Sequence, residues 1–136
     1  MSYELRDHTA DVGIAATAGS LGGVMAALAD GMAAAQCDEW PAVGDRFDVE
    51  VRAENPEALL FDYLDELIYR RDVLNVLPVD NEATVREAGG EWILEGSAMG
   101  VPLDRIHARE IKAVTYSEMR IEETDDEWEA YVVLDV

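Results

Sequence analysis

Two stretches of the chain carry apolar residues at the spacing of an α-helix. The first covers roughly residues 20–36, where Ser20 is placed to cap the N-terminus. Its apolar face is formed by Leu21, Val24, Met25, Leu28 and Met32. The methionines are expected to fill the core rather than to form a groove for a partner.

The second helix has the clearest start in the sequence. Asn55-Pro56-Glu57 combines a capping Asn, a Pro at the first helical position and an acid near the positive end of the helix dipole. Arg70 and Arg71 are suited to the negative end. The apolar stripe between them consists of Leu60, Tyr63, Leu64, Leu67 and Ile68.

Several other stretches alternate apolar and polar residues or are short and apolar, which predicts β-strands. Gly89-Gly90 predicts a hairpin, Gly100–Leu103 a break, and Asp125-Asp126 a turn. The last strand places Asp135 at its end, on the face opposite its apolar row. The predicted strands lie near residues 3–5, 12–16, 47–51, 73–79, 83–87, 92–96, 111–122 and 128–135.

This order of elements predicts an α+β fold. The simplest arrangement is a two-layer sandwich, a mostly antiparallel sheet with two helices on one face, built by a single domain over residues 1–136. No apolar run approaches the ~20 residues of a membrane helix, and no signal peptide is recognised. A single Cys37 excludes an internal disulfide and favours a cytoplasmic location.

The charge changes the picture of the surface. Thirty acidic residues against ten basic ones give a formal net charge of −20, and the acids are scattered along the chain. This is typical of a protein from a halophilic cytoplasm, because concentrated salt screens the repulsion. The alternative is an acidic docking face for a basic partner. The sequence contains no basic cluster of the kind that neutralises phosphates, so tight direct binding of nucleic acid is not expected.

Candidate chemistry lies at the two ends of the chain. His8 and Asp11 are three residues apart, and Asp135 is followed by the carboxylate of Val136. If the ends meet, they form an oxygen-rich pocket for a hard divalent cation, with Ca²⁺ or Mg²⁺ favoured over Zn²⁺. The spacing of His8 and Asp11 alone favours hydrogen bonds to a loop backbone over a metal site.

Lys112 is the only lysine in the chain. Its ammonium is suited to a phosphate, to a metal-bound acid or to a partner, or simply to a local pair with Glu110 or Glu118. The sequence contains no glycine-rich phosphate loop, no Gly-x-Ser-x-Gly turn and no Cys/His nucleophile pair. No self-sufficient catalytic site is therefore predicted.

Four blocks together resemble the archease family. They are Asp7–Gly13, Leu60–Tyr69, Glu110–Tyr116 and Leu134–Val136, and in order they span nearly the whole chain. Family members commonly have His after the Lys-Ala-Val-Thr-Tyr run, where this chain has Ser117. Any role of that His is therefore in doubt here.

The resemblance implies a partner and an ion. Archeases act with the RNA ligase that joins tRNA halves, promoting guanylylation of the ligase and multiple turnover, and they are not themselves the enzyme. They bind a divalent ion, so the resemblance implies Asp11, Asp135 and Val136 as metal ligands. Ca²⁺ is the expected ion, with Mg²⁺ or Mn²⁺ as alternatives. His8 and Lys112 are implied to support the site or to contact the partner.

Two other functions stay open at this point. The first is a chaperone-like interaction module in RNA processing, in which the metal ion is purely structural. The second is a metal-dependent hydrolase or a nucleotide-binding enzyme, against which stands the missing catalytic motif.

Overall fold

Seven strands form two antiparallel sheets in the structure, a computed structural model that describes residues 2–7 and 11–136. The first sheet has the order β1-β2-β7-β6, with β1 at Ser2–Asp7, β2 at Asp11–Ala18, β6 at Ala113–Glu123 and β7 at Trp128–Asp135. The second has the order β3-β5-β4, with β3 at Asp45–Ala53, β4 at Val76–Ala88 and β5 at Glu91–Pro102. A short 3₁₀ helix, η1, covers Leu103–Arg105.

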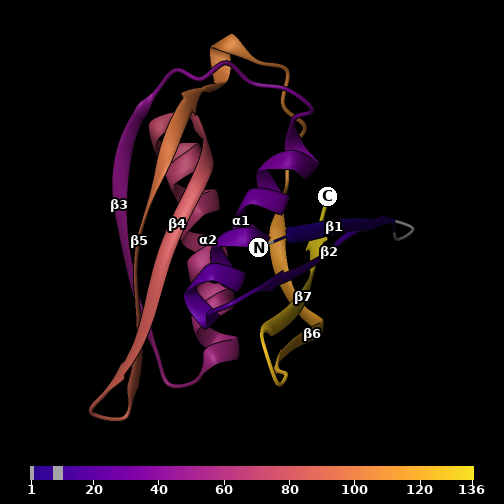
Figure 1. Cartoon of the computed structure of the whole chain (residues 1–136). Helices are drawn as coiled ribbons and strands as arrows, with labels where there is room; N and C mark the ends of the chain where they lie inside the picture. The colour runs from indigo at the N-terminus through magenta and orange to yellow at the C-terminus, as the bar shows by residue number, and fades with distance from the viewer. Residues whose placement is uncertain (1, 8–10) are drawn as a thin grey trace.

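The two helices lie between the sheets, as Figure 1 shows. Helix α1, Leu21–Gln36, is buried on nearly all sides because it packs against both sheets. Small residues permit this close packing. A Cβ on Gly22 would lie 2.5 Å from the carbonyl oxygen of Ala83 in β4, and one on Gly31 would lie 2.6 Å from the side chain of Ile14 in β2. The glycines that weaken the isolated helix are therefore the residues that let the two sheets approach it.

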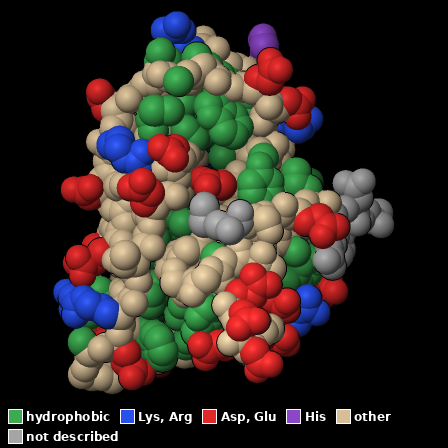
Figure 2. All heavy atoms as spheres, viewed as in Figure 1, with side chains coloured by type: hydrophobic (Ala, Val, Ile, Leu, Met, Phe, Trp, Pro, Cys, Tyr) green, Lys and Arg blue, Asp and Glu red, His purple; other side chains and the backbone are tan. Residues whose placement is uncertain are grey.

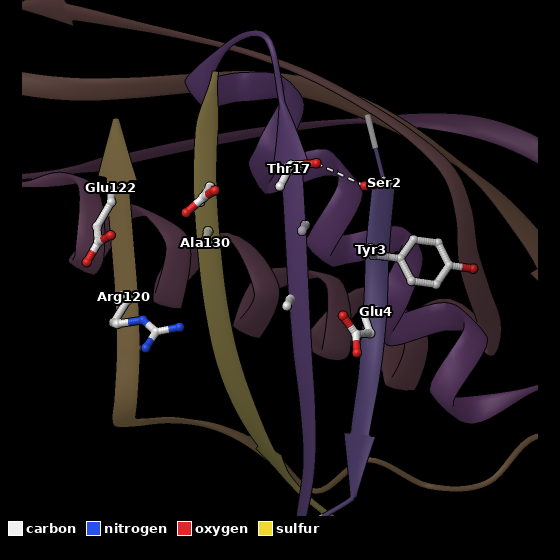
Figure 3. A pocket seen from close by; sticks show the side chains of 10 residues that line it. Ser2, Tyr3, Glu4, Thr17, Arg120, Glu122 and Ala130 are labelled. Carbon is white, nitrogen blue, oxygen red and sulfur yellow. Dashed lines mark hydrogen bonds between the residues drawn. The ribbon is translucent and has the colours of Figure 1, made fainter. Parts of the chain in front are cut away.

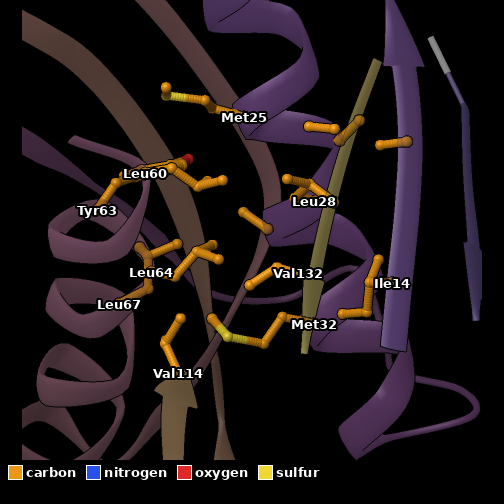
Figure 4. Close-up of a cluster of buried hydrophobic side chains, with 14 of the residues drawn as sticks. Ile14, Met25, Leu28, Met32, Leu60, Tyr63, Leu64, Leu67, Val114 and Val132 are labelled. Atoms are coloured by element: carbon orange, nitrogen blue, oxygen red, sulfur yellow. The ribbon is translucent and has the colours of Figure 1, made fainter. Parts of the chain in front are cut away.

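Helix α2, Pro56–Leu74, completes the core (Figure 4). Its stripe packs toward α1 and the first sheet, where Met25 and Met32 are buried as core residues, as expected. The most buried members of this core include Ile14, Leu28, Leu60, Tyr63, Leu64, Leu67 and Val132. One hydrophobic interior thus holds all three layers together.

The predicted α+β class and antiparallel pairing are confirmed. Both predicted caps are also present: the Ser20 hydroxyl accepts a hydrogen bond from the Gly23 N–H at 3.0 Å, and the Asn55 side-chain oxygen Oδ1 accepts one from the Ala58 N–H at 2.8 Å. The sheet is divided in two, which the sequence did not predict. Each sheet carries the two helices on one of its faces, so the sandwich has three layers.

Two predicted boundaries differ from the structure, and the strands predicted near 73–79 and 83–87 are one strand, β4, with a register shift between Val79 and Glu82. Helix α2 continues to Leu74 and stops at Asn75, whose φ of 59° is left-handed, so the strand expected from residue 73 begins at Val76. Strand β5 runs through the predicted break to Pro102 because it pairs there with β4. The predicted hairpin turn is confirmed, with positive φ values of 60° at Gly89 and 84° at Gly90. Within the described part of the chain, no helix is long and apolar enough to cross a membrane.

Candidate functional site: a carboxylate pair at the end of the first sheet

The structure brings Asp11 and Asp135 together. Strands β2 and β7 are antiparallel neighbours, and their register places Asp11 directly opposite Asp135. Directly opposed residues on one face of an antiparallel pair have Cβ atoms about 4.5–5.5 Å apart. The second and the last strands of the chain thus place the two predicted carboxylates side by side.

Both carboxylates lie on the outer face of the first sheet. Val12 and Ile14 of β2 and Val132 and Leu134 of β7 point into the core. Because side chains alternate along a strand, Asp11 and the neighbouring Asp135 face away from the helices. Both are half-buried. The predicted orientation of Asp135 is confirmed.

Two like charges directly opposed on a sheet destabilise it unless a cation offsets them. Among the side chains that the structure describes, those of residues 2–5 and 11–136, neither Asp11 nor Asp135 has a hydrogen-bond or ion-pair partner. Half-buried carboxylates of this kind suit a hard divalent cation, which takes oxygen ligands. In the described ranges no group of three His, Cys, Asp or Glu residues is placed to hold a metal ion.

Lys112 and Val136 flank the pair. The main-chain N–H of Lys112 donates a hydrogen bond to the carbonyl oxygen of Asp135 at 2.8 Å, and Ala113 is the β6 partner of Asp135. Lys112 is exposed, and within the described residues its ammonium forms no ion pair with Glu110 or any other acid. Val136 follows Asp135 directly and is 41% exposed. The main chain of Lys112 and the exposed Val136 therefore lie next to Asp135.

The remaining predicted residues bear on the site less directly. His8 lies outside the described residues. Asp7 ends β1, with Val12 as its backbone partner. Ser117 is exposed, in the stretch between Thr115 and Arg120 where the register of β6 against β7 shifts. Whatever occupies position 117 is thus on an irregular sheet edge rather than at the carboxylate pair.

A shallow hollow of about 320 Å³ lies toward the other end of the same sheet (Figure 3). Arg120 of β6 reaches into it, with its guanidinium carbon 5.4 Å from the centre of the Tyr131 ring. Glu122 of β6 and Glu129 of β7 are directly opposed at its margin. The hollow does not include Asp11 or Asp135. It is a separate mixed-charge surface that the sequence did not indicate.

One further titratable cluster is internal. Burial raises the pKa of Asp30 above its ordinary 3.8, although one carboxylate oxygen accepts hydrogen bonds at 2.9 Å from both the main-chain N–H and the side-chain amide of Asn81. Burial and the charge of Asp30 also raise the pKa of Tyr63, whose hydroxyl has no partner in the described structure. This cluster joins α1 to β4 and is structural.

These observations define a small α+β protein with a half-buried carboxylate pair joining its N-terminal and C-terminal strands. Comparison with known proteins gives the family. The model of the archease protein family (MTH1598/TM1083) matches residues 3–136. The chain belongs to the archease family.

Individual relatives match along their whole length. The chain is 32% identical to protein archease of Pyrococcus furiosus, covering 98% of both chains, and 34% identical to that of Methanosarcina barkeri, covering 98% of this chain and 95% of the relative. The solution structure of Methanobacterium thermoautotrophicum protein 1598 superposes with a TM-score of 0.85 at 31% identity, covering 99% of each chain. The crystal structure of a Thermotoga maritima archease, described as a possible chaperone, has the same fold, with a TM-score of 0.64 at 19% identity and coverage of 96% of this chain and 94% of that one.

Proposed function

We propose that this chain is a non-catalytic activator of the RNA ligase that joins tRNA halves during tRNA splicing. It promotes guanylylation of the ligase and its repeated turnover. Membership of the archease family supports the partner, through the resemblance described above. The observation that carries the proposal is the opposed pair of carboxylates, Asp11 and Asp135, at the end of the motif-bearing strands.

A divalent cation completes this activator. Asp11 and Asp135 hold it, together with a main-chain oxygen of Val136, and Ca²⁺ fits best because all the donors are oxygens. Mg²⁺ and Mn²⁺ take the same donors. When bound, the ion offsets the two negative charges and orders the ends of β2 and β7. Lys112, free and exposed beside the pair, is placed to contact an acidic or phosphorylated group of the ligase.

The test mixes the chain with its cognate ligase, GTP and Mn²⁺ or Mg²⁺ and follows ligase guanylylation. The wild type should accelerate it at substoichiometric amounts. Asp11→Asn and Asp135→Asn should lose the stimulation. The matched control is Asp62→Asn, which removes one exposed charge on α2, where no ion pair is formed with another described residue. Absence of any rate change with the wild type would remove the proposal.

A chaperone-like interaction module is the second candidate, favoured by the description of the Thermotoga maritima protein as a possible chaperone. The metal ion is then purely structural. In that case Ca²⁺ raises the thermal stability of the chain, but Asp11→Asn still acts on its client once it is folded. The two functions are separated by whether the variant fails in the ligase assay at a temperature where it is fully folded.

The acidity of the surface is proposed to be an adaptation to concentrated salt in a cytoplasm. Acidic side chains occur across the whole face shown in Figure 2 rather than in one patch, and basic side chains are few. A docking face for a basic partner would instead gather the acidic side chains in one patch. With a net charge of −20 at pH 7, the chain is expected to act on RNA through its protein partner rather than by binding RNA tightly itself.

A further inference from the structure

A cleft of about 390 Å³ lies between the C-terminal end of α1, the last turns of α2 and residues 103–110. Arg71, Asp72, His107 and Arg109 are among the residues that line it. Neither Asp11 nor Asp135 does. The cleft is therefore a distinct feature of the molecule.

The segment that forms its rim has an unusual charge for this chain. Residues 105–112 contain three of the ten Lys and Arg residues and one of the two His residues, but only one acid, Glu110. The whole chain has a formal net charge of −20. Of residues 105–112, His107, Arg109 and Glu110 line the cleft, together with Arg71 and Asp72.

The buried side of the cleft is formed by Arg71. Its side chain is only 8% exposed, and its guanidinium is held from three directions. Nη1 donates to the Gln36 side-chain oxygen at 2.8 Å, Nη2 to the Ile111 carbonyl oxygen at 3.1 Å, and Nε to an Asp72 oxygen at 3.1 Å. A guanidinium carries five N–H groups, and Nη1 makes only this one bond with the described residues. A fixed, buried cation with spare donor capacity therefore lines the cleft.

The charge of Arg71 is only weakly offset. Its one carboxylate partner is Asp72, whose side chain is 63% exposed and contacts it through a single oxygen. At the rim, Arg109 is anchored by its Nε to the Ala35 carbonyl oxygen at 3.2 Å. Its Nη2 reaches only the exposed Asp38, at 3.4 Å. The Arg109–Asp38 pair is exposed on both sides and contributes little, so the Arg109 guanidinium can exchange Asp38 for a better anion.

We propose that this cleft binds the phosphoryl group of a small ligand. Arginine matches phosphate because its planar fork donates parallel hydrogen bonds to two oxygens. Arg71 binds from the buried side, and Arg109 and His107 bind from the rim. Leu103 and Ile106 give the cleft an apolar side, which suits a nucleotide as well as inorganic phosphate. The site is independent of the ligase and of the metal ion, so it is tested on the isolated chain.

The experiment is a titration of the full chain with inorganic phosphate and, separately, with adenosine monophosphate, at constant ionic strength set by potassium chloride. Binding is read from the NMR shifts of the arginine Nε–H groups. Arg109→Gln should weaken binding about tenfold, the value of one hydrogen bond to a charged group. Arg52→Gln is the matched control, because Arg52 is an exposed arginine on β3 that pairs with Glu50 and Glu91.

Asp72→Asn separates a binding role from a structural one. It removes the carboxylate that competes for Arg71, so phosphate should bind about two- to fivefold tighter. If Arg71 only holds α2 against its neighbours, Asp72→Asn should not increase the affinity for phosphate. Equal affinity for phosphate and adenosine monophosphate would show that the cleft recognises the phosphoryl group alone. Tighter binding of adenosine monophosphate would show that the apolar side of the cleft also contacts the nucleoside. The proposal is overturned if neither probe shifts the Arg71 and Arg109 signals beyond chloride, or if Arg52→Gln weakens binding as much as Arg109→Gln.

Discussion

Replacing Asp11 by Asn should change the stability of the protein in opposite directions with and without a divalent cation. Asn keeps the shape of the side chain and removes one of the two opposed charges of Asp11 and Asp135. In metal-free solution the change relieves repulsion, so the variant should be the more stable protein. In Ca²⁺ the wild type gains the binding energy of the ion, and the variant loses a charged ligand.

The magnitude follows from Coulomb's law. Two unit charges about 5 Å apart repel by about 0.8 kcal/mol at the dielectric constant of water and by about 3 kcal/mol at an effective value of ~20. Asp11 and Asp135 are half-buried, and physiological salt screens part of the repulsion, so about 1 kcal/mol is expected. Ca²⁺ at a hundredfold excess over its dissociation constant stabilises the wild type by about 2.7 kcal/mol. The difference between the two proteins should therefore change sign.

The assay is thermal unfolding followed by circular dichroism, first with EDTA and then with a Ca²⁺ titration. For a chain of this size, 1 kcal/mol corresponds to about 3–5 °C in Tm. Asp11→Asn should melt a few degrees above the wild type in EDTA and below it in saturating Ca²⁺. Asp62→Asn, on the exposed face of α2, should follow the wild type under both conditions. The reasoning is refuted if the Tm difference between Asp11→Asn and wild type is the same with and without Ca²⁺.

Three further results are expected. The Tm should rise as salt increases from about 0.1 M to 1 M, because the Debye length falls from about 10 Å to about 3 Å and screens a net charge of −20; a falling Tm would contradict the salt-adaptation proposal. Leu64 is 0% exposed in the core, so Leu64→Ala should lower the free energy of unfolding, measured in urea, by about 2–5 kcal/mol. Val73 is 59% exposed on the same helix, so Val73→Ala should change it by less than about 0.5 kcal/mol. Burial raises the pKa of Asp30 above 3.8, so the stability that Asp30 contributes is present below pH 3.8 and is lost as the pH rises through its folded-state pKa. Urea unfolding curves should show the free energy of unfolding of Asp30→Asn increasing relative to that of the wild type as the pH rises. Parallel pH profiles of the two proteins would contradict this.

The parts of this structure that the sequence predicted are those set by neighbouring residues. The caps at Ser20 and Asn55 and the turn at Gly89-Gly90 each depend on a few adjacent positions, and each is confirmed. The end of α2 was predicted too early because the apolar residues Val73 and Leu74 suit a strand as well as a helix. The stop is given by the left-handed Asn75.

The division of the strands into two sheets depends on contacts that no local pattern carries. Strand β3 pairs with β5, and β2 pairs with β7, across long stretches of intervening chain. The composition of helix α1 gave one indirect indication that the helix lies between two sheets. It is so rich in alanine and glycine that both of its faces can be covered, as they are between Gly22 and Ala83 on one side and Gly31 and Ile14 on the other.

The carboxylate pair and the arginine cleft also differ in how far the sequence predicted them. Asp135 was predicted from its place at the end of an alternating strand, and Asp11 from its position near the other end of the chain and from the family resemblance. The register of β2 against β7 makes them neighbours. Arg71 was predicted only as a charge closing a helix. Its role in the cleft depends on Gln36 and Ile111, which lie 35 and 40 residues away in the sequence.

The carboxylate pair also ties the ion to the completion of the fold. Asp11 lies at the start of β2 and Asp135 at the end of β7, and they become neighbours only when these strands pair in the observed register. A shift of that register by one residue would turn Asp135 toward the core and bring Leu134 to the outer face. A cation held by both carboxylates therefore binds the native register and not the unfolded chain. If the proposed Ca²⁺ is bound there, it should slow the separation of β2 from β7 more than the unfolding of the second sheet, because both carboxylates lie on these two strands.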